Sequence, residues 1–102
     1  MLELRPNCEC CDRDLPPDST EAMICSYECT FCVDCVEQVL HNVCPNCGGG
    51  LVARPIRPQR CYREEVGLVH HPASGLRVHT PYSREQIAAF VAAISPLNPS
   101  ER

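Results

Sequence analysis

The stretch of sequence that decides the fold runs from Cys8 to Cys47 and reads CECCDRDLPPDSTEAMICSYECTFCVDCVEQVLHNVCPNC. It contains nine of the ten cysteines of a 102-residue chain. Eight of them form four close pairs: Cys8 with Cys11, Cys25 with Cys29, Cys32 with Cys35, and Cys44 with Cys47. Two cysteines separated by two or three residues on a tight turn present both sulfur atoms to one tetrahedral ion. The four pairs therefore predict two zinc sites, each held by four thiolates.

Size and composition also favour a metal-stabilised fold. A unit of roughly 40 to 50 residues rarely folds on a hydrophobic core alone, and this chain has no Trp, two Phe and three Tyr. The N-terminal MLELRPNCEC has neither a cationic start nor the apolar run of a signal peptide. We therefore expect a cytoplasmic protein without a membrane partner. In a reducing compartment its thiols are expected to bind zinc in preference to forming disulfides or iron–sulfur clusters.

The charge pattern bears on partners. The formal net charge is −4, and all nine basic residues are Arg. Eight thiolates and two Zn²⁺ ions would make the chain still more acidic, which argues against non-specific nucleic-acid binding. A local basic segment remains, the Arg54–Arg63 strip, whose arginines recur every three residues between prolines: Arg54, Arg57, Arg60 and Arg63. In a polyproline II conformation they would line one edge, either as a solvated linker or as a contact strip for carboxylates or phosphates.

Apolar periodicity predicts two helices and a hairpin. Val36, Val39, Leu40 and Val43 have helical spacing, so residues 34–43 are expected to form a short helix across the zinc sites. Residues 64–82 resemble two strand arms around a PASG turn. Residues 83–94 predict an amphipathic helix, with Ser83 and Gln86 in position for a capping box.

Several metal-binding residue types lie outside the four pairs: Cys10, Cys61, His41, His70, His71 and His79. Cys10 is expected to be a spare thiol, with replacement of a neighbouring ligand as the alternative. Cys61 is expected to be a free thiol, and a redox or metal-buffering role for both thiols is a further hypothesis. His41 is expected on the surface. The three C-terminal histidines lack metal-ligand spacing, so a metal or catalytic site among them is the less favoured interpretation.

The spacing C-x2-C-x13-C-x3-C-x2-C-x2-C-x8-C-x2-C resembles the RING finger and its relatives over residues 1–55. That resemblance implies a small zinc-stabilised α+β fold of the RING-like or treble-clef type, with interleaved pairs. Site one would be Cys8, Cys11, Cys32 and Cys35, and site two would be Cys25, Cys29, Cys44 and Cys47. A sequential arrangement of the pairs is the alternative.

The chain departs from RING ubiquitin ligases at positions that matter for docking. All eight ligands are Cys, Glu9 replaces the apolar residue that usually follows the first ligand, and three glycines follow Cys47. The stretch is more similar to a bacterial family of short cysteine-rich proteins of unknown function that shares the CTFC…CPNCGG pattern. That resemblance implies a zinc fold without an assigned activity.

The residues together predict a non-enzymatic zinc module that contacts proteins. A four-thiolate site leaves no coordination position for a catalytic water. Residues 1–55 are expected to form the two-zinc domain, 56–63 an Arg/Pro-rich linker, and 64–102 a hairpin-and-helix extension. The alternatives are a RING-type ubiquitin-ligase-like protein and a nucleic-acid-binding zinc finger that uses the Arg54–Arg63 strip.

Overall fold

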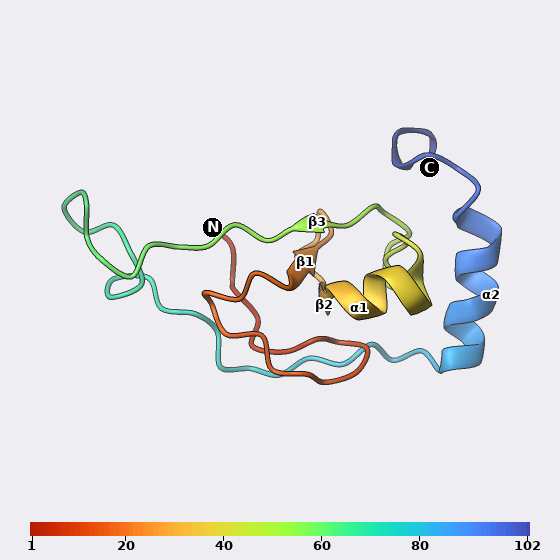
Figure 1. The fold of residues 1–102 in the computed structure, drawn as a ribbon, viewed down its shortest axis with the longest axis horizontal. Coiled ribbons are helices and arrows are strands. Elements are labelled where there is room, and N and C mark those ends of the chain that lie inside the picture. The colour runs from red at the N-terminus through yellow and green to blue at the C-terminus, as the bar shows by residue number, and fades with distance from the viewer.

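The cysteine-rich turns interrupt the chain often, so its strands and helices are short (Figure 1). The computed structural model describes residues 1–102, in an elongated shape of 46 × 27 × 18 Å. The elements in chain order are β1 (Ala22–Ile24), β2 (Thr30–Cys32), α1 (Val33–Cys35), η1 (Val36–Leu40), β3 (Val52–Ala53), α2 (Arg84–Ile94) and η2 (Pro99–Glu101). Helix α2 lies at one end of the molecule, and the loop between β3 and α2 extends to the other.

A three-stranded antiparallel sheet with the order β2–β1–β3 brings the cysteine turns together. Met23 of β1 pairs with Phe31 on one side and with Ala53 on the other. The β1–β2 connection carries Cys25 and Cys29, and Cys32 ends β2. The hairpin therefore delivers cysteines at both its turn and its base.

The core is small and is built around the thiols. Phe31 is fully buried, and it forms one cluster with six of the cysteines and with residues from helix α2. The largest apolar side chains with it are Leu15, Leu40, Val43 and Ile87. With so few large apolar groups, little of the surface that the unfolded chain exposes can be buried, and further stabilisation is needed.

The predicted helix after Cys35 is confirmed, although it is shorter than expected. It runs from Val33 through α1 into a π-helical turn, η1, and buries Val36 and Leu40. His41 and Asn42 follow with φ of 46° and 62°, respectively. Because left-handed residues cannot continue a right-handed helix, the helix ends before Val43.

Helix α2 is confirmed with its capping box, in which the Ser83 hydroxyl accepts from the Gln86 amide. Its buried face packs on η1 and on the turn after Cys47. A Cβ atom added at Gly48 would lie 3.4 Å from Ile94 Cδ1 and 3.6 Å from the Phe90 ring. The cysteine-rich part of the chain therefore covers the apolar face of α2.

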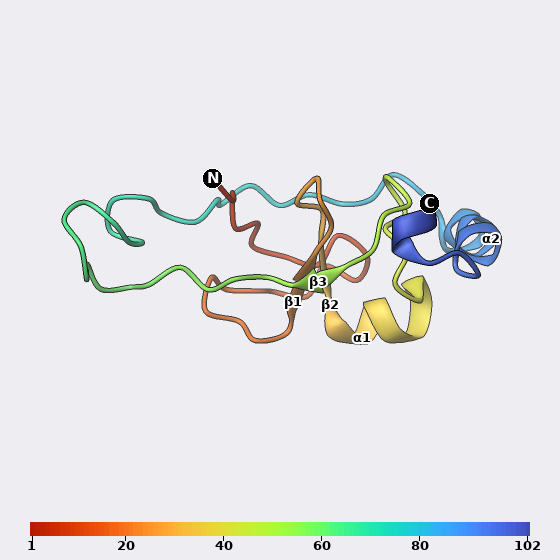
Figure 2. The same ribbon diagram turned by 90° about the horizontal axis from the view of Figure 1, so that it is seen from above.

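The hairpin expected over residues 64–82 is wrong, because no strand forms between β3 and α2. Residues 72–80 run beside the N-terminal segment instead (Figures 1 and 2). The Ser74 amide donates to the Glu3 carbonyl oxygen at 2.9 Å, and the Thr80 amide donates to that of Glu9 at 3.0 Å. Residues 3–9 thus provide backbone acceptors for this segment in place of a second strand arm.

The prediction that the four arginines of the Arg54–Arg63 strip line one exposed edge is also wrong. Arg54 is 5% exposed. Its guanidinium donates at 2.8–3.3 Å to the main-chain carbonyl oxygens of Arg5, Leu15 and Pro16. Arg57 likewise donates to two carbonyl oxygens, at 2.6 and 2.7 Å. Sequence periodicity placed these side chains on one surface, but the first two hold the chain together and only Arg60 and Arg63 are exposed.

None of the helices has the length and apolar character needed to cross a membrane.

Candidate metal centre

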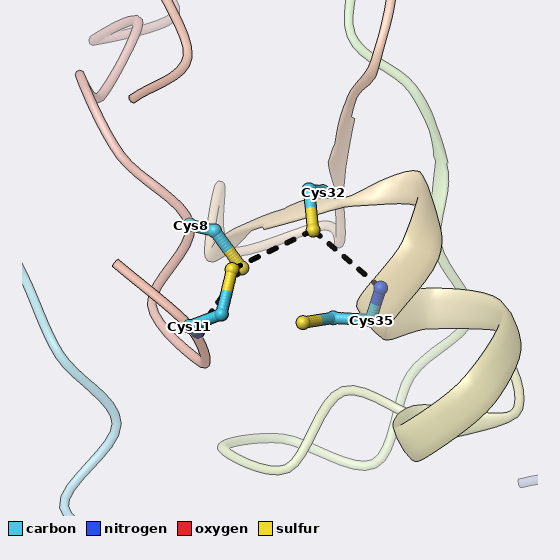
Figure 3. A group of neighbouring side chains, drawn as sticks. All are labelled: Cys8, Cys11, Cys32 and Cys35. Atoms are coloured by element: carbon cyan, nitrogen blue, oxygen red, sulfur yellow. Dashed lines mark hydrogen bonds between the residues drawn. The ribbon is translucent and has the colours of Figure 1, made fainter. Parts of the chain in front are cut away.

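Four sulfur atoms converge where the first cysteine turn meets the end of β2. Cys8, Cys11, Cys32 and Cys35 present ligand atoms that all lie within 4.8 Å of one another (Figure 3). The first two come from the turn after Asn7, and the other two flank the start of α1. The structure therefore combines the first pair with the third.

The spacing in this first cysteine group fits a tetrahedral ion. The Cys11 and Cys32 sulfur atoms lie 3.8 Å apart, and four sulfur ligands about 2.3 Å from a zinc ion are separated by about 3.8 Å. The Cys11 amide donates to Cys8 Sγ, and the Cys35 amide donates to Cys32 Sγ, each at 3.5 Å (Figure 3). Such N–H groups stabilise thiolates, so the donor set and its surroundings fit zinc.

A second cysteine group lies where the β1–β2 turn meets the turn before Gly48. Cys25, Cys44 and Cys47 have sulfur atoms mutually within 4.8 Å. Cys29 does not lie within 4.8 Å of all three, but its side chain is close enough to Cys44 for the two thiols to shift each other's pKa. The interaction between the two thiols lowers the pKa of Cys29 to about 5 and raises the pKa of Cys44. The second group thus combines the second pair with the fourth.

The two cysteine groups distinguish between the interleaved and the sequential arrangement of the four pairs, which the spacing alone left open. The sequential arrangement requires Cys8 and Cys25 to share a site, but these residues belong to different groups. The interleaved arrangement arises because the β1–β2 hairpin separates Cys25 and Cys29 at its turn from Cys32 at its base.

The turns of the two outer pairs have the same local geometry. The Asp12 amide donates to the Cys8 carbonyl oxygen at 2.8 Å, and the Gly48 amide donates to that of Cys44 at 2.7 Å. Asp12 and Gly48 adopt φ of 67° and 83°, respectively. Both are residue types that tolerate the left-handed region. The hydrogen bond and the left-handed residue close each turn, so the two sulfur atoms of the pair point toward one side.

Burial keeps several thiols protonated in the absence of metal. It raises the pKa of Cys8 and of Cys25 to about 11, and it also raises the pKa of Cys35. A divalent ion would replace these protons and supply the positive charge that buried thiolates lack. Each group also has one exposed member, Cys11 in the first and Cys47 in the second.

Sequence reasoning missed a buried carboxylate between the two groups. Glu9, expected at an exposed docking position, is only 2% exposed. It accepts hydrogen bonds from the Thr30 amide, the Arg5 guanidinium and the Asn46 side chain. Burial raises the pKa of Glu9, and the Thr30 amide and the Arg5 guanidinium oppose this shift. No local pattern marks Glu9, since its partners come from 4 to 37 residues away.

The other candidate ligands lie outside both groups. Cys10 is half-buried against the core and Cys61 is exposed, and neither joins a group. No histidine belongs to a group either. His79 lies 3.4 Å from an Asp12 carboxylate oxygen, while His41 is exposed and caps η1. The structure therefore does not assemble a three-histidine site.

Fold and site together define a small cysteine-rich α+β protein with two cysteine groups positioned to bind metal ions. The family described as "Protein of unknown function (DUF1272)" matches residues 1–57, a range that includes all eight paired cysteines. "Uncharacterized protein R02474" of Rhizobium meliloti (strain 1021) is 59% identical over 81 residues, which cover 79% of this chain and 89% of that protein. The chain therefore belongs to the DUF1272 family. No solved structure matches it.

Proposed function

We propose that this protein is a zinc-binding, non-catalytic interaction module that holds two Zn²⁺ ions. The first ion would be bound by Cys8, Cys11, Cys32 and Cys35, and the second by Cys25, Cys29, Cys44 and Cys47. The observation that carries the proposal is the first cysteine group, whose four sulfur atoms lie within 4.8 Å of one another, with those of Cys11 and Cys32 3.8 Å apart. For the second ion, Cys29 would move by a small side-chain adjustment from its contact with Cys44 to complete the ligand set.

The donor set supports a structural role for the metal. Four thiolates fill the tetrahedron of zinc, so the ion offers no position at which a water molecule or a substrate could be activated. Zinc would instead contribute folding free energy, on the order of 10 kcal/mol per structural site in small domains. That contribution would stabilise a chain whose apolar core contains a single buried Phe.

Protein contact is supported by apolar side chains away from the cysteines. The loop between β3 and α2 exposes several large ones: Ile56, Tyr62, Val66, Val69 and Leu76. Large apolar side chains gathered on one exposed segment are characteristic of interaction surfaces.

Neither alternative function has comparable support. In RING ligases the residue after the first ligand docks the conjugating enzyme, but here Glu9 is buried and its carbonyl oxygen accepts from the Thr80 amide. Nucleic-acid binding through the Arg54–Arg63 strip would lack two of its four arginines, because Arg54 and Arg57 donate to main-chain carbonyl groups.

Native mass spectrometry of the purified chain tests the zinc proposal. We expect two zinc ions per chain, loss of one ion in Cys29→Ser, and two retained ions in the control Cys61→Ser. Complete chelation should abolish the thermal unfolding transition followed by circular dichroism. A chain that binds no zinc, or one that melts identically with and without metal, would contradict the proposal.

A further inference from the structure

Glu9 belongs to the turn of the first cysteine group, but its side chain reaches the second. It lies between Cys8 and Cys11, so an ion bound to that pair also positions the Glu9 backbone. Its Oε1 accepts from Asn46 Nδ2 at 3.2 Å, and Asn46 lies between Cys44 and Cys47. One carboxylate therefore links the outer turns of the two groups directly.

The other carboxylate oxygen binds the segment that serves both groups. Glu9 Oε2 accepts from the Thr30 amide at 2.6 Å and from Arg5 Nη1 at 3.0 Å. Thr30 follows Cys29 of the second pair and precedes Cys32 of the third. In return, the Glu9 amide donates to the Thr30 carbonyl oxygen at 2.9 Å. The position of Cys29 thus depends on where Glu9 is held.

Asn46 completes the link on the side of the second group. Its side chain hydrogen-bonds with Glu9, and Asn46 and Cys29 line the same surface hollow. Its Oδ1 accepts from the Thr80 hydroxyl at 2.9 Å. Asn46 therefore carries a restraint from Glu9 to the one cysteine that lies outside the 4.8 Å limit of its group.

We propose that Glu9 and Asn46 couple the loading of the two metal sites, so that zinc bound at one group favours zinc at the other. An ion on the first group fixes the turn and with it the Glu9 carboxylate, which then orders Cys29 and the Cys44–Cys47 turn. Coupling between sites is reciprocal, so an ion on the second group strengthens binding at the first by the same factor. This inference rests on the proposed two-zinc function, and Glu9 and Asn46 act as positioning residues that do not bind the metal.

Each group contains one exposed cysteine that can report on its site, Cys11 for the first and Cys47 for the second. The experiment loads the metal-free full chain with one equivalent of zinc, counts ions per molecule by native mass spectrometry, and maps alkylated thiols. For the wild-type chain we expect molecules with two ions or none, and protection of both reporters in the same molecules. A predominant one-zinc species in the wild type would overturn the coupling.

Asn46→Ala breaks the link at its exposed end, because the Asn46 side chain is exposed. Glu9 Oε1 loses its donor, but Oε2 keeps the Thr30 amide and Arg5, which still hold the carboxylate. We expect the one-zinc species to increase at least about fivefold, the low end of typical coupling factors. Alkylation should increase at Cys11 as well as at Cys47, although Asn46 lies in the turn of the second group. An increase confined to Cys47 would mean that Asn46 merely supports its own turn, and would overturn the proposal.

Glu9→Gln gives a second, independent variant of the same link. It retains the size of the side chain but replaces one acceptor with a donor, so it should also increase the one-zinc species. The double variant with Asn46→Ala should show no more of this species than the stronger single variant, because both changes break one connection. Gln38→Ala on the exposed side of η1 is the control and should behave as the wild type. Additive effects would overturn the coupling, whereas absence of any bound zinc would contradict the proposed function itself.

Discussion

Arg77 holds Asp12, the residue that closes the first cysteine turn. Arg77 Nη2 lies 2.7 Å from Asp12 Oδ1 and 2.6 Å from the Asp12 carbonyl oxygen. Its Nη1 also reaches Asp14 Oδ1 at 2.7 Å. One guanidinium thus attaches the segment before α2 to the turn that carries Cys8 and Cys11.

Replacement of Arg77 by Ala should lower the melting temperature of the zinc-loaded protein, and Arg77→Lys should restore only part of the loss. Lysine restores the charge but cannot reproduce the planar fork that binds a carboxylate and a carbonyl group together. The effect should shrink at high salt, because the partners are exposed and screened. Arg63→Ala, which removes an exposed arginine, is the control. Equal melting temperatures for Arg77→Ala and the wild type at low salt would contradict this prediction.

Zinc affinity should rise with pH through neutrality. Burial raises the pKa of Cys8 and of Cys25 to about 11, so both thiols are protonated in the metal-free chain at pH 7. Binding must release these protons, and raising the pH lowers the cost of releasing them. Calorimetric titrations in buffers with different ionisation enthalpies would measure the protons released. Release that stays at zero across the neutral range would show that the thiols are already ionised.

Gly48→Ala should destabilise the zinc-loaded protein by about 1–2 kcal/mol, the cost of a left-handed conformation for a residue with a Cβ atom. Gly48 has φ of 83°, and an added Cβ would also contact Ile94 Cδ1 at 3.4 Å. Gly75→Ala is the matched control, because nothing lies within 4 Å of its Cβ position and its backbone is not left-handed. Denaturant unfolding would compare the two variants. A similar stability change for both would show that the conformation of Gly48 is not decisive.

Arg54→Ala should destabilise the protein by about 2–3 kcal/mol, because it leaves buried carbonyl oxygens without donors. Arg60→Ala should leave stability unchanged, since Arg60 is exposed. Chemical unfolding of both variants would test whether these arginines, six residues apart, have different roles. If the two substitutions have equally small effects, the buried hydrogen bonds of Arg54 contribute little.

Features whose causes are local in sequence were predictable. The paired cysteine spacing indicated two cysteine groups, and Ser83 with Gln86 indicated where α2 begins. In each case the interacting atoms lie within a few residues of one another, so spacing and residue type are sufficient. The short helix after Cys35 was predictable for the same reason, apart from its end at His41.

Features that depend on distant partners were decided by the tertiary structure alone. The sequence determined that eight cysteines come in four pairs, but the β1–β2 hairpin decided that Cys8 joins Cys32 and not Cys25. Residues 72–80 bind residues 3–9 in place of pairing as a hairpin. Glu9 and Arg54 look like surface residues in the sequence, and only the folded chain supplies the hydrogen-bond partners that allow their burial. The physical reason is that burial of a charge requires a complete set of partners, which segments far apart in the sequence provide together.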